Sequence, residues 1–320
     1  MPVNLDKPQK WKADITRSVD FYNNWFMNFA PQAFRETRIK TTKQVEEALK
    51  WTNNLINIKP EVLEKYPNIL PMLRMTTCPP IARDRLIGLA RVSNNLVKVM
   101  ELKGKTPPKM KKDELYQDLK KIINIIRKMA DVDIFTWLAN QHHPHEVEIY
   151  RASTIVADRL CGAVADPIIR NAQEQRQLAS IAEWLKKRGY EQIMSGEGIS
   201  FDSIKPGTFS FRMIVPANLK GKDKQVNIPI DAVIMPKNSV PGDYPILFEA
   251  KSAGDFTNTN KRRKEEAVKM MQLMSTYGKN IKFVLFLCGY FDSGYLGYEA
   301  AEGIDWVWEH RIDELNEFGL

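Results

Sequence analysis

Hydrophobic positions in the first half of the chain recur at the three- to four-residue spacing of amphipathic helices. One such pattern begins at Thr41 or Thr42, either of which can serve as the N-cap, and two others cover residues 82–102 and 113–129. A proline- and glycine-rich segment, residues 104–108, separates the last two. The first half of the chain is therefore predicted to be helical.

The pattern changes after Pro167. A helix is predicted over residues 168–188, ending at Gly189, and short apolar runs of strand length follow it. Strands are expected at residues 208–215, 226–235, 246–251 and 282–287. A basic helix is expected over residues 261–277, before the last strand. This order predicts a mixed α/β (α+β) core over residues 166–320, with a helical N-terminal subdomain over residues 1–165.

Composition narrows the class of protein. The 320 residues are 43% hydrophobic and 27% charged, which argues against a disordered or collagen-like chain. The longest apolar run is too short for a membrane-crossing helix, and the first residues lack a secretory signal. Cys78, Cys161 and Cys288 are too few and too widely spaced for a disulfide framework or a cysteine zinc site. A cytoplasmic protein is expected.

The net charge of +8 is unevenly distributed. Residues 251–282 contain eight basic and three acidic residues, whereas residues 292–320 contain eight acidic residues and Arg311 as their one basic residue. A basic body with a strongly basic segment favours a polyanionic partner such as nucleic acid. An ordinary solvated basic surface is the alternative.

Three charged residues interrupt the predicted apolar strands: Asp231 in one, and Glu249 and Lys251 in the next. Because side chains alternate between the two faces of a strand, Glu249 and Lys251 share a face, and pairing of the strands would bring Asp231 to them. Two carboxylates can hold Mg²⁺, and a lysine can orient water or neutralise charge on phosphate. This chemistry suits phosphodiester hydrolysis. The alternative is a structural ion pair between Glu249 and Lys251.

Glu174 is a further acidic candidate. It lies on the same predicted helical face as the apolar residues Leu178, Ile181 and Leu185, and so is expected to point inward. There it would act as an additional ligand of metal or water. A carboxylate at the rim of the core is the alternative reading.

A basic cluster, residues 261–264, is predicted to open a helix. Cations in a first helical turn oppose the helix dipole unless an anion lies nearby, so this cluster predicts phosphate contacts, with Arg262 and Arg263 as possible base readers. A solvated basic face is the alternative. The apolar stripe of this helix is expected to contain Met270, Met271 and Met274 as core residues.

Other chemistry-bearing residues give weaker signals. His142, His143 and His145 match no zinc signature, and their role is open, with a loop in solvent or near DNA favoured. Trp306 and Trp308 are expected to be packing residues. The chain has no phosphate-binding Walker loop or dinucleotide fingerprint, so no nucleotide cofactor is expected.

An Asp followed by Glu-x-Lys on consecutive strands, preceded by a helix with a carboxylate, resembles the PD-(D/E)xK nuclease superfamily. One residue separates Pro229 from Asp231, a departure that leaves the pattern recognisable. Residues 248–266, together with residues 76–86, are similar to the XamI-type restriction endonucleases.

The resemblance implies a prokaryotic, cytoplasmic type II restriction endonuclease. Such an enzyme would use Mg²⁺ and act as a homodimer on a short palindromic site in double-stranded DNA. Asp231, Glu249 and Lys251 carry over as the catalytic set, with Asp231 and Glu249 as metal ligands, whereas Glu174 rests on its helical face alone. The candidate DNA contacts are Ser252, Asn258, Asn260, Lys261, Arg262 and Arg263. A repair or recombination nuclease of the same superfamily and an inactive DNA-binding protein remain as alternatives.

Overall fold

The computed structural model describes residues 2–194, 196, 199–218, 225–257 and 259–320. The side chains of residues 260–262 lie outside the description. The chain forms two compact units: Met1–Phe29 together with Arg170–Leu320, and Ala30–Ile169. The first will be called the sheet unit and the second the helical unit. The helical unit is therefore inserted into the sequence of the sheet unit.

The helical unit is built around one apolar core, to which Leu119, Ile122 and Ile126 contribute fully buried side chains. Two long helices, α1 (Pro8–Trp51) and α8 (Glu146–Lys187), contribute residues to both units. The elements between them are α2 (Pro60–Lys65), η1 (Pro67–Ile69), α3 (Leu70–Met75), α4 (Arg83–Ala90), α5 (Asn94–Lys103), α6 (Lys112–Met129) and α7 (Thr136–Asn140).

The helix expected over residues 113–129 is confirmed as α6, but two other helix predictions are wrong in their bounds. Thr41 caps no helix; it lies inside α1, where its hydroxyl donates to the carbonyl oxygen of Thr37 at 3.1 Å. The segment 82–102 is two helices, because Arg91 adopts a left-handed conformation and Ser93 then caps α5. A threonine can satisfy its hydroxyl within a helix, so a cap-like residue does not define a helix start.

Helix α8 ends at Lys187, and Gly189 follows with a φ of 74°, so the predicted end is confirmed. Its predicted start is wrong, because the helix begins at Glu146 and continues through Pro167. Proline removes one helical hydrogen bond and strains the turn before it, but a long helix with many remaining bonds and packed side chains accommodates it.

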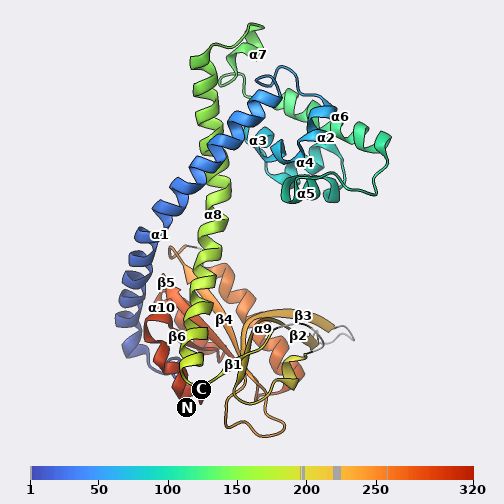
Figure 1. Ribbon diagram of the computed structural model, residues 1–320. Helices are drawn as coiled ribbons and strands as arrows, with labels where there is room; N and C mark the ends of the chain where they lie inside the picture. Colours follow the sequence, from blue (N-terminus) through green and yellow to red (C-terminus); the bar gives the residue numbers. More distant parts are fainter. Residues whose placement is uncertain (1, 195, 197–198, 219–224, 258) are drawn as a thin grey trace. The chain divides into compact units, whose positions relative to one another are not determined.

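The sheet unit contains one six-stranded sheet in the order β1-β2-β3-β4-β5-β6 (Figure 1). Strands β2, β3 and β4 pair antiparallel, whereas β1 is parallel to β2 and β4, β5 and β6 are parallel to one another. The strands are β1 (Glu191–Gln192), β2 (Thr208–Asn218), β3 (Gln225–Ile234), β4 (Ile246–Ala253), β5 (Lys282–Gly289) and β6 (Asp305–Trp308). The expected mixed α/β class and its four central strands are confirmed.

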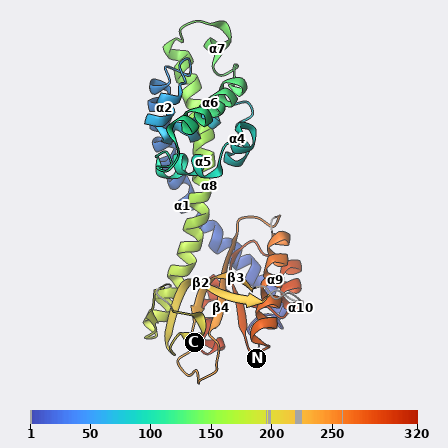
Figure 2. The same ribbon diagram turned by 90° about the vertical axis from the view of Figure 1, so that its right-hand side faces the viewer.

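Two apolar layers cover the sheet. Ile181 and Leu185 of α8 pack with Phe248 of β4 on one face. Helices α9 (Thr259–Tyr277) and α10 (Ser293–Ala301) cover the other face, where Leu247 belongs to the apolar cluster (Figure 2). Side chains of β4 therefore alternate between the layers, as predicted. The remaining short helices are η2 (Phe201–Ser203) and η3 (Glu309–Phe318).

Residues 1–29 belong to the sheet unit, which differs from the expected division into 1–165 and 166–320. Residues 1–29 join the sheet unit because they contact β6. Both carboxylate oxygens of Asp305, the first residue of β6, accept backbone N–H groups from Val3, Asn4 and Leu5. The Trp11 ring then lies 5.5 Å from that of Trp306, which is fully buried. Trp306 and Trp308 are thus packing residues, as expected.

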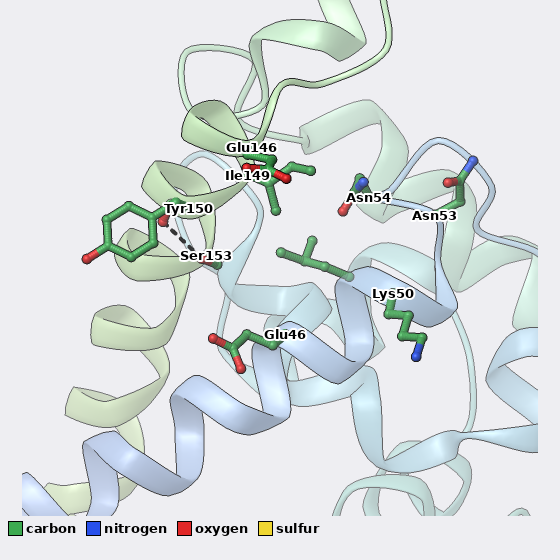
Figure 3. A pocket seen from close by; sticks show the side chains of 9 residues that line it. Glu46, Lys50, Asn53, Asn54, Glu146, Ile149, Tyr150 and Ser153 are labelled. Carbon is green, nitrogen blue, oxygen red and sulfur yellow. Dashed lines mark hydrogen bonds between the residues drawn. The ribbon is translucent and has the colours of Figure 1, made fainter.

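A cavity of about 500 Å³ lies within the helical unit, between side chains of α1 and α8 (Figure 3). Glu46, Lys50 and Tyr150 are among the residues that line it. Charged groups of both signs surround it without forming a catalytic cluster. Among the described residues, no helix is long and apolar enough to cross a membrane.

Candidate active site

Pairing of β3 with β4 brings the three predicted catalytic residues together. Ala232 lies opposite Phe248 in the register, so Asp231 is placed beside the segment that carries Glu249 and Lys251. Oδ2 of Asp231 accepts the backbone N–H of Ala250 at 2.9 Å. The two strands therefore fix the carboxylate of Asp231 against the Glu-x-Lys segment.

The surroundings of Asp231 disfavour its charged form. Burial, followed by the negative charge of Glu249, raises its pKa to about 6. The hydrogen bond from Ala250 and the charge of Lys251 act in the opposite direction, and the charge of Glu174 adds a further small increase. A bound cation would favour the ionised carboxylate, because opposite charge stabilises it.

The carboxylate of Glu249 has two oxygens in different environments. Oε1 accepts from the ammonium groups of Lys251, at 3.0 Å, and Lys269, at 2.6 Å. Oε2 is buried and has no hydrogen-bond partner among the described residues. A buried carboxylate oxygen without a partner is costly, so this atom is suited to an additional ligand such as a cation.

Lys251 keeps its charge although it is largely buried. Burial alone would lower the pKa of its ammonium, but Glu249 and Glu266 outweigh burial and raise it. Its Nζ lies 3.3 Å from Oε1 of Glu266, a fully buried residue of α9. The lysine is therefore held between a carboxylate of its own strand and one of a helix.

Glu174 lies close to this cluster without contacting it directly. Leu178, Ile181 and Leu185 are buried as its helical face predicts, but the Glu174 side chain is 37% exposed and pairs with Arg212 at 2.8 Å. Arg212 lies between residues paired with Ile230 and Ala232, and so stands opposite the candidate catalytic Asp. A role for Glu174 as a metal or water ligand stays a prediction.

The predicted DNA contacts are described only in part. Asn258 lies outside the described residues, as do the side chains of Asn260, Lys261 and Arg262, although the backbone of these three lies in the first turn of α9. The guanidinium carbon of Arg263 lies 4.6 Å from the centroid of the Tyr298 ring in α10. Ser252 follows Lys251 in β4.

The basic cluster of residues 261–264 therefore lies at the start of α9, as predicted. Its contacts with DNA remain a prediction.

Sequence reasoning missed Glu266 and Lys269. The buried stripe of α9 contains Glu266, Met270 and Leu273, at positions i, i+4 and i+7, whereas Met271 is 45% exposed, contrary to its expected place in the core. A charged residue on an apolar stripe is the same signal that singled out Glu174. A predicted apolar stripe that began one residue earlier along the helix, at position 266, would have included Glu266.

The histidine segment forms a helix cap. His142 Nε2 lies 3.0 Å from Oε2 of Glu148, which also accepts the backbone N–H of His145 at 2.9 Å. Hydrogen bonds from Thr136, from His145 and from His142 lower the pKa of Glu148 to about 2. The bond from the His145 N–H to Glu148 is one half of a capping box at the start of α8. Within the described parts of the chain, no group of three or more His, Cys, Asp or Glu residues could hold a metal ion.

Comparison with known proteins identifies the family of this chain. The family model described as XamI restriction endonuclease matches residues 53–308. The chain is 53% identical to the type II restriction enzyme SalI of Streptomyces albus G over 317 residues, which cover 99% of each chain. Among solved structures, the protein VC1899 from Vibrio cholerae is similar with a TM-score of 0.29 and 10% identity, over 80% of this chain and 55% of that one. This chain belongs to the XamI restriction endonuclease family.

Proposed function

We propose that this protein is a type II restriction endonuclease that hydrolyses double-stranded DNA at a short palindromic sequence, with Mg²⁺ as its cofactor. The proposal rests above all on the meeting of Asp231, Glu249 and Lys251 at the junction of β3 and β4. Membership of the XamI family and the likeness to a type II restriction enzyme support it. We assign the core to the PD-(D/E)xK superfamily on the same residues, and the activity to the prokaryotic cytoplasm.

Asp231 and Glu249 are the proposed ligands of Mg²⁺. The unpartnered Oε2 of Glu249 and the raised pKa of Asp231 indicate a site with surplus negative charge, which a divalent cation would compensate. When bound, Mg²⁺ would polarise the phosphoryl oxygen and lower the pKa of a coordinated water. The backbone N–H of Ala250 keeps Asp231 turned toward the site.

Lys251 has the complementary role. Its ammonium is positively charged, partly exposed at 18% of its side chain, and fixed beside Glu249. An ammonium in this position can donate to the attacking water and neutralise charge that develops on the phosphate in the transition state. Lys269, which also donates to Glu249, adds a second positive charge to the site.

DNA binding is proposed for the basic first turn of α9 and for Ser252. A helix N-terminus presents free backbone N–H groups, and basic side chains around it attract phosphate. A homodimer would place one active site on each strand of a palindrome, because two-fold protein symmetry matches the symmetry of the site. We assign DNA contacts, dimerisation or both to the helical unit.

The first test is incubation of the purified protein with plasmid and phage DNA, with and without Mg²⁺, beside an Asp231→Ala variant. Discrete bands that require both Mg²⁺ and Asp231 are the expected result, and they would allow the site to be mapped. A Mg²⁺-dependent smear would instead indicate a repair or recombination nuclease. DNA binding without cleavage would indicate an inactive binding protein.

A further inference from the structure

A buried acidic network lies beside the proposed catalytic lysine, on its helix-facing side. It comprises Glu266 of α9 with Tyr295 and Glu299 of α10, and both glutamates are fully buried. Charged side chains are rarely buried so completely without a specific partner. Packing alone therefore does not explain why two glutamates are buried here.

The contacts of Glu266 link the active site to α10. One of its oxygens, Oε1, lies 3.3 Å from the Nζ of Lys251. The other, Oε2, accepts the hydroxyl of Tyr295 at 3.0 Å. Burial raises the pKa of Tyr295, followed by the negative charges of Glu266 and Glu299, so the phenol keeps its proton and remains a donor. Glu266 is thus held in place from the side opposite the lysine.

The second buried glutamate, Glu299, has a shifted pKa. Burial and then the charge of Glu266 raise the pKa of Glu299 to about 8, so Glu299 carries a proton at neutral pH. Glu266 itself has the Tyr295 hydroxyl on Oε2 and the Lys251 ammonium 3.3 Å from Oε1. Its carboxyl group therefore faces Lys251 from α9.

We infer that Glu266 is a positioning residue that fixes the ammonium of Lys251 in the orientation required for hydrolysis. The inference rests on the proposed function. A lysine has a flexible four-carbon stem, and one partner alone leaves its ammonium considerable freedom. Glu249 is also a proposed metal ligand, so its negative charge would be shared between the cation and Lys251. Glu266 supplies a second anchor from a different element.

The test compares Glu266→Gln with Glu265→Gln, which makes the same change at the adjacent, exposed position of α9. Cleavage is measured under single-turnover conditions with Mg²⁺, and DNA affinity is measured with Ca²⁺ in its place. Glu266→Gln is expected to slow cleavage about 10- to 100-fold, since small displacements of a catalytic group have effects of this size. DNA affinity is expected to change less than about two-fold, because Glu266 is fully buried and exposes no side chain to a DNA ligand. The control is expected to cleave at the wild-type rate.

This split between rate and affinity separates positioning from a general loss of structure, which would weaken both. An unchanged cleavage rate in Glu266→Gln, with the wild type active, contradicts this inference alone. No cleavage by the wild type contradicts the proposed function itself. Should Glu266→Gln fail to fold, Tyr295→Phe removes the donor and retains the ring. A slower rate with unchanged affinity in that variant supports the inference, and an unchanged rate overturns it.

Discussion

At the scale of single residues, the candidate active site places similar carboxyl groups in different environments. Glu249 has one oxygen shared by two ammonium groups and one buried oxygen without a described partner, whereas Asp231 is anchored by a backbone N–H. Glu299 differs from both, because it is buried against another carboxylate and holds a proton. Three carboxyl groups thus have three different settings. Glu249 and Asp231 are proposed metal ligands, and Asp231 is also anchored by the backbone. Glu299 is a protonated carboxyl group buried beside Glu266.

Asp231→Asn is expected to abolish cleavage while DNA binding is retained. The amide oxygen can still accept the Ala250 N–H, but the negative charge proposed to hold Mg²⁺ is lost. Because metal stabilisation of the transition state is worth several kcal/mol, the rate should fall by about 100-fold or more. Single-turnover cleavage and a gel-shift assay in Ca²⁺ measure the two effects. Wild-type cleavage by this variant would exclude Asp231 from the catalytic set.

Glu299→Gln is expected to flatten the dependence of stability on pH. Between the usual pKa of 4.5 and about 8, the folded protein binds a proton at Glu299 that the unfolded chain has released. The free energy of unfolding therefore falls as pH rises through this range, by at most about 1.4 kcal/mol per pH unit from this group.

Melting temperatures at pH 6 and pH 8.5 provide the measurement for this variant. The decrease in melting temperature from pH 6 to pH 8.5 should be larger for the wild type than for Glu299→Gln. Equal decreases would show that Glu299 does not hold the extra proton. The exposed Glu191 of β1 provides a control, since Glu191→Gln should keep the wild-type decrease.

At the scale of elements, β4 and α9 supply most of the site. β4 provides Glu249 and Lys251, and α9 provides Glu266 and Lys269 on the face that packs against them. The first turn of α9 carries the basic cluster. One helix thus combines the proposed DNA contacts with the support of Lys251, the proposed catalytic lysine.

Arg263→Ala is expected to weaken DNA binding and to reduce its salt dependence. Loss of one phosphate contact lowers the slope of log affinity against log salt concentration by about 1. Affinities measured between about 50 and 200 mM salt provide the slope. Lys279→Ala, at an exposed position beyond the other end of α9, serves as the control. Identical slopes for Arg263→Ala and the wild type would show that Arg263 makes no phosphate contact.

The central strands and the meeting of Asp231, Glu249 and Lys251 could be predicted from the sequence because their signals are local. Alternation along residues 246–251 places Glu249 and Lys251 on one face, whatever the rest of the chain does. Glu266 and Lys269 could not be placed at the site in this way, since their contacts join a strand to a helix. The strand β6, of four residues, and the start of α1 likewise depend on packing partners about 300 residues away in sequence.

At the scale of the whole molecule, the sheet unit is made from both ends of the chain. The carboxylate of Asp305 accepts three backbone N–H groups of the first residues, and Trp11 packs on Trp306. Further along α1, the hydroxyl of Ser18 accepts the backbone N–H of Gly289 at 2.8 Å. These contacts hold the first 29 residues to the strands that carry the proposed catalytic residues.

Asp305→Ala is expected to destabilise the protein by roughly 3 kcal/mol, because buried N–H groups left without an acceptor cost about 1–3 kcal/mol each. Urea unfolding followed by tryptophan fluorescence measures the change. Glu302→Ala, at an exposed position near β6, should have a midpoint close to that of the wild type. A wild-type midpoint for Asp305→Ala would show that the N-terminal residues contribute little to the stability of the sheet unit.

A homodimer is expected in solution, in keeping with the proposed palindromic site. Sedimentation analysis should give twice the 36.9 kDa mass of one chain. Cleavage of both strands of a palindrome within one binding event is the functional counterpart. A mass of 36.9 kDa at every concentration, with cleavage still site-specific, would contradict the dimer.

The contact between Asp305 and the first residues also has a consequence for the order of events during synthesis. The groups that it joins are separated by about 300 positions, so the first segment emerges from the ribosome long before its acceptor exists. Contacts between such distant residues form late, because closing a long loop is entropically costly. The helical unit can fold while the rest of the chain is still being translated. We therefore expect the sheet unit to mature only after β6 has been translated, so that a nascent chain that lacks β6 would lack cleavage activity.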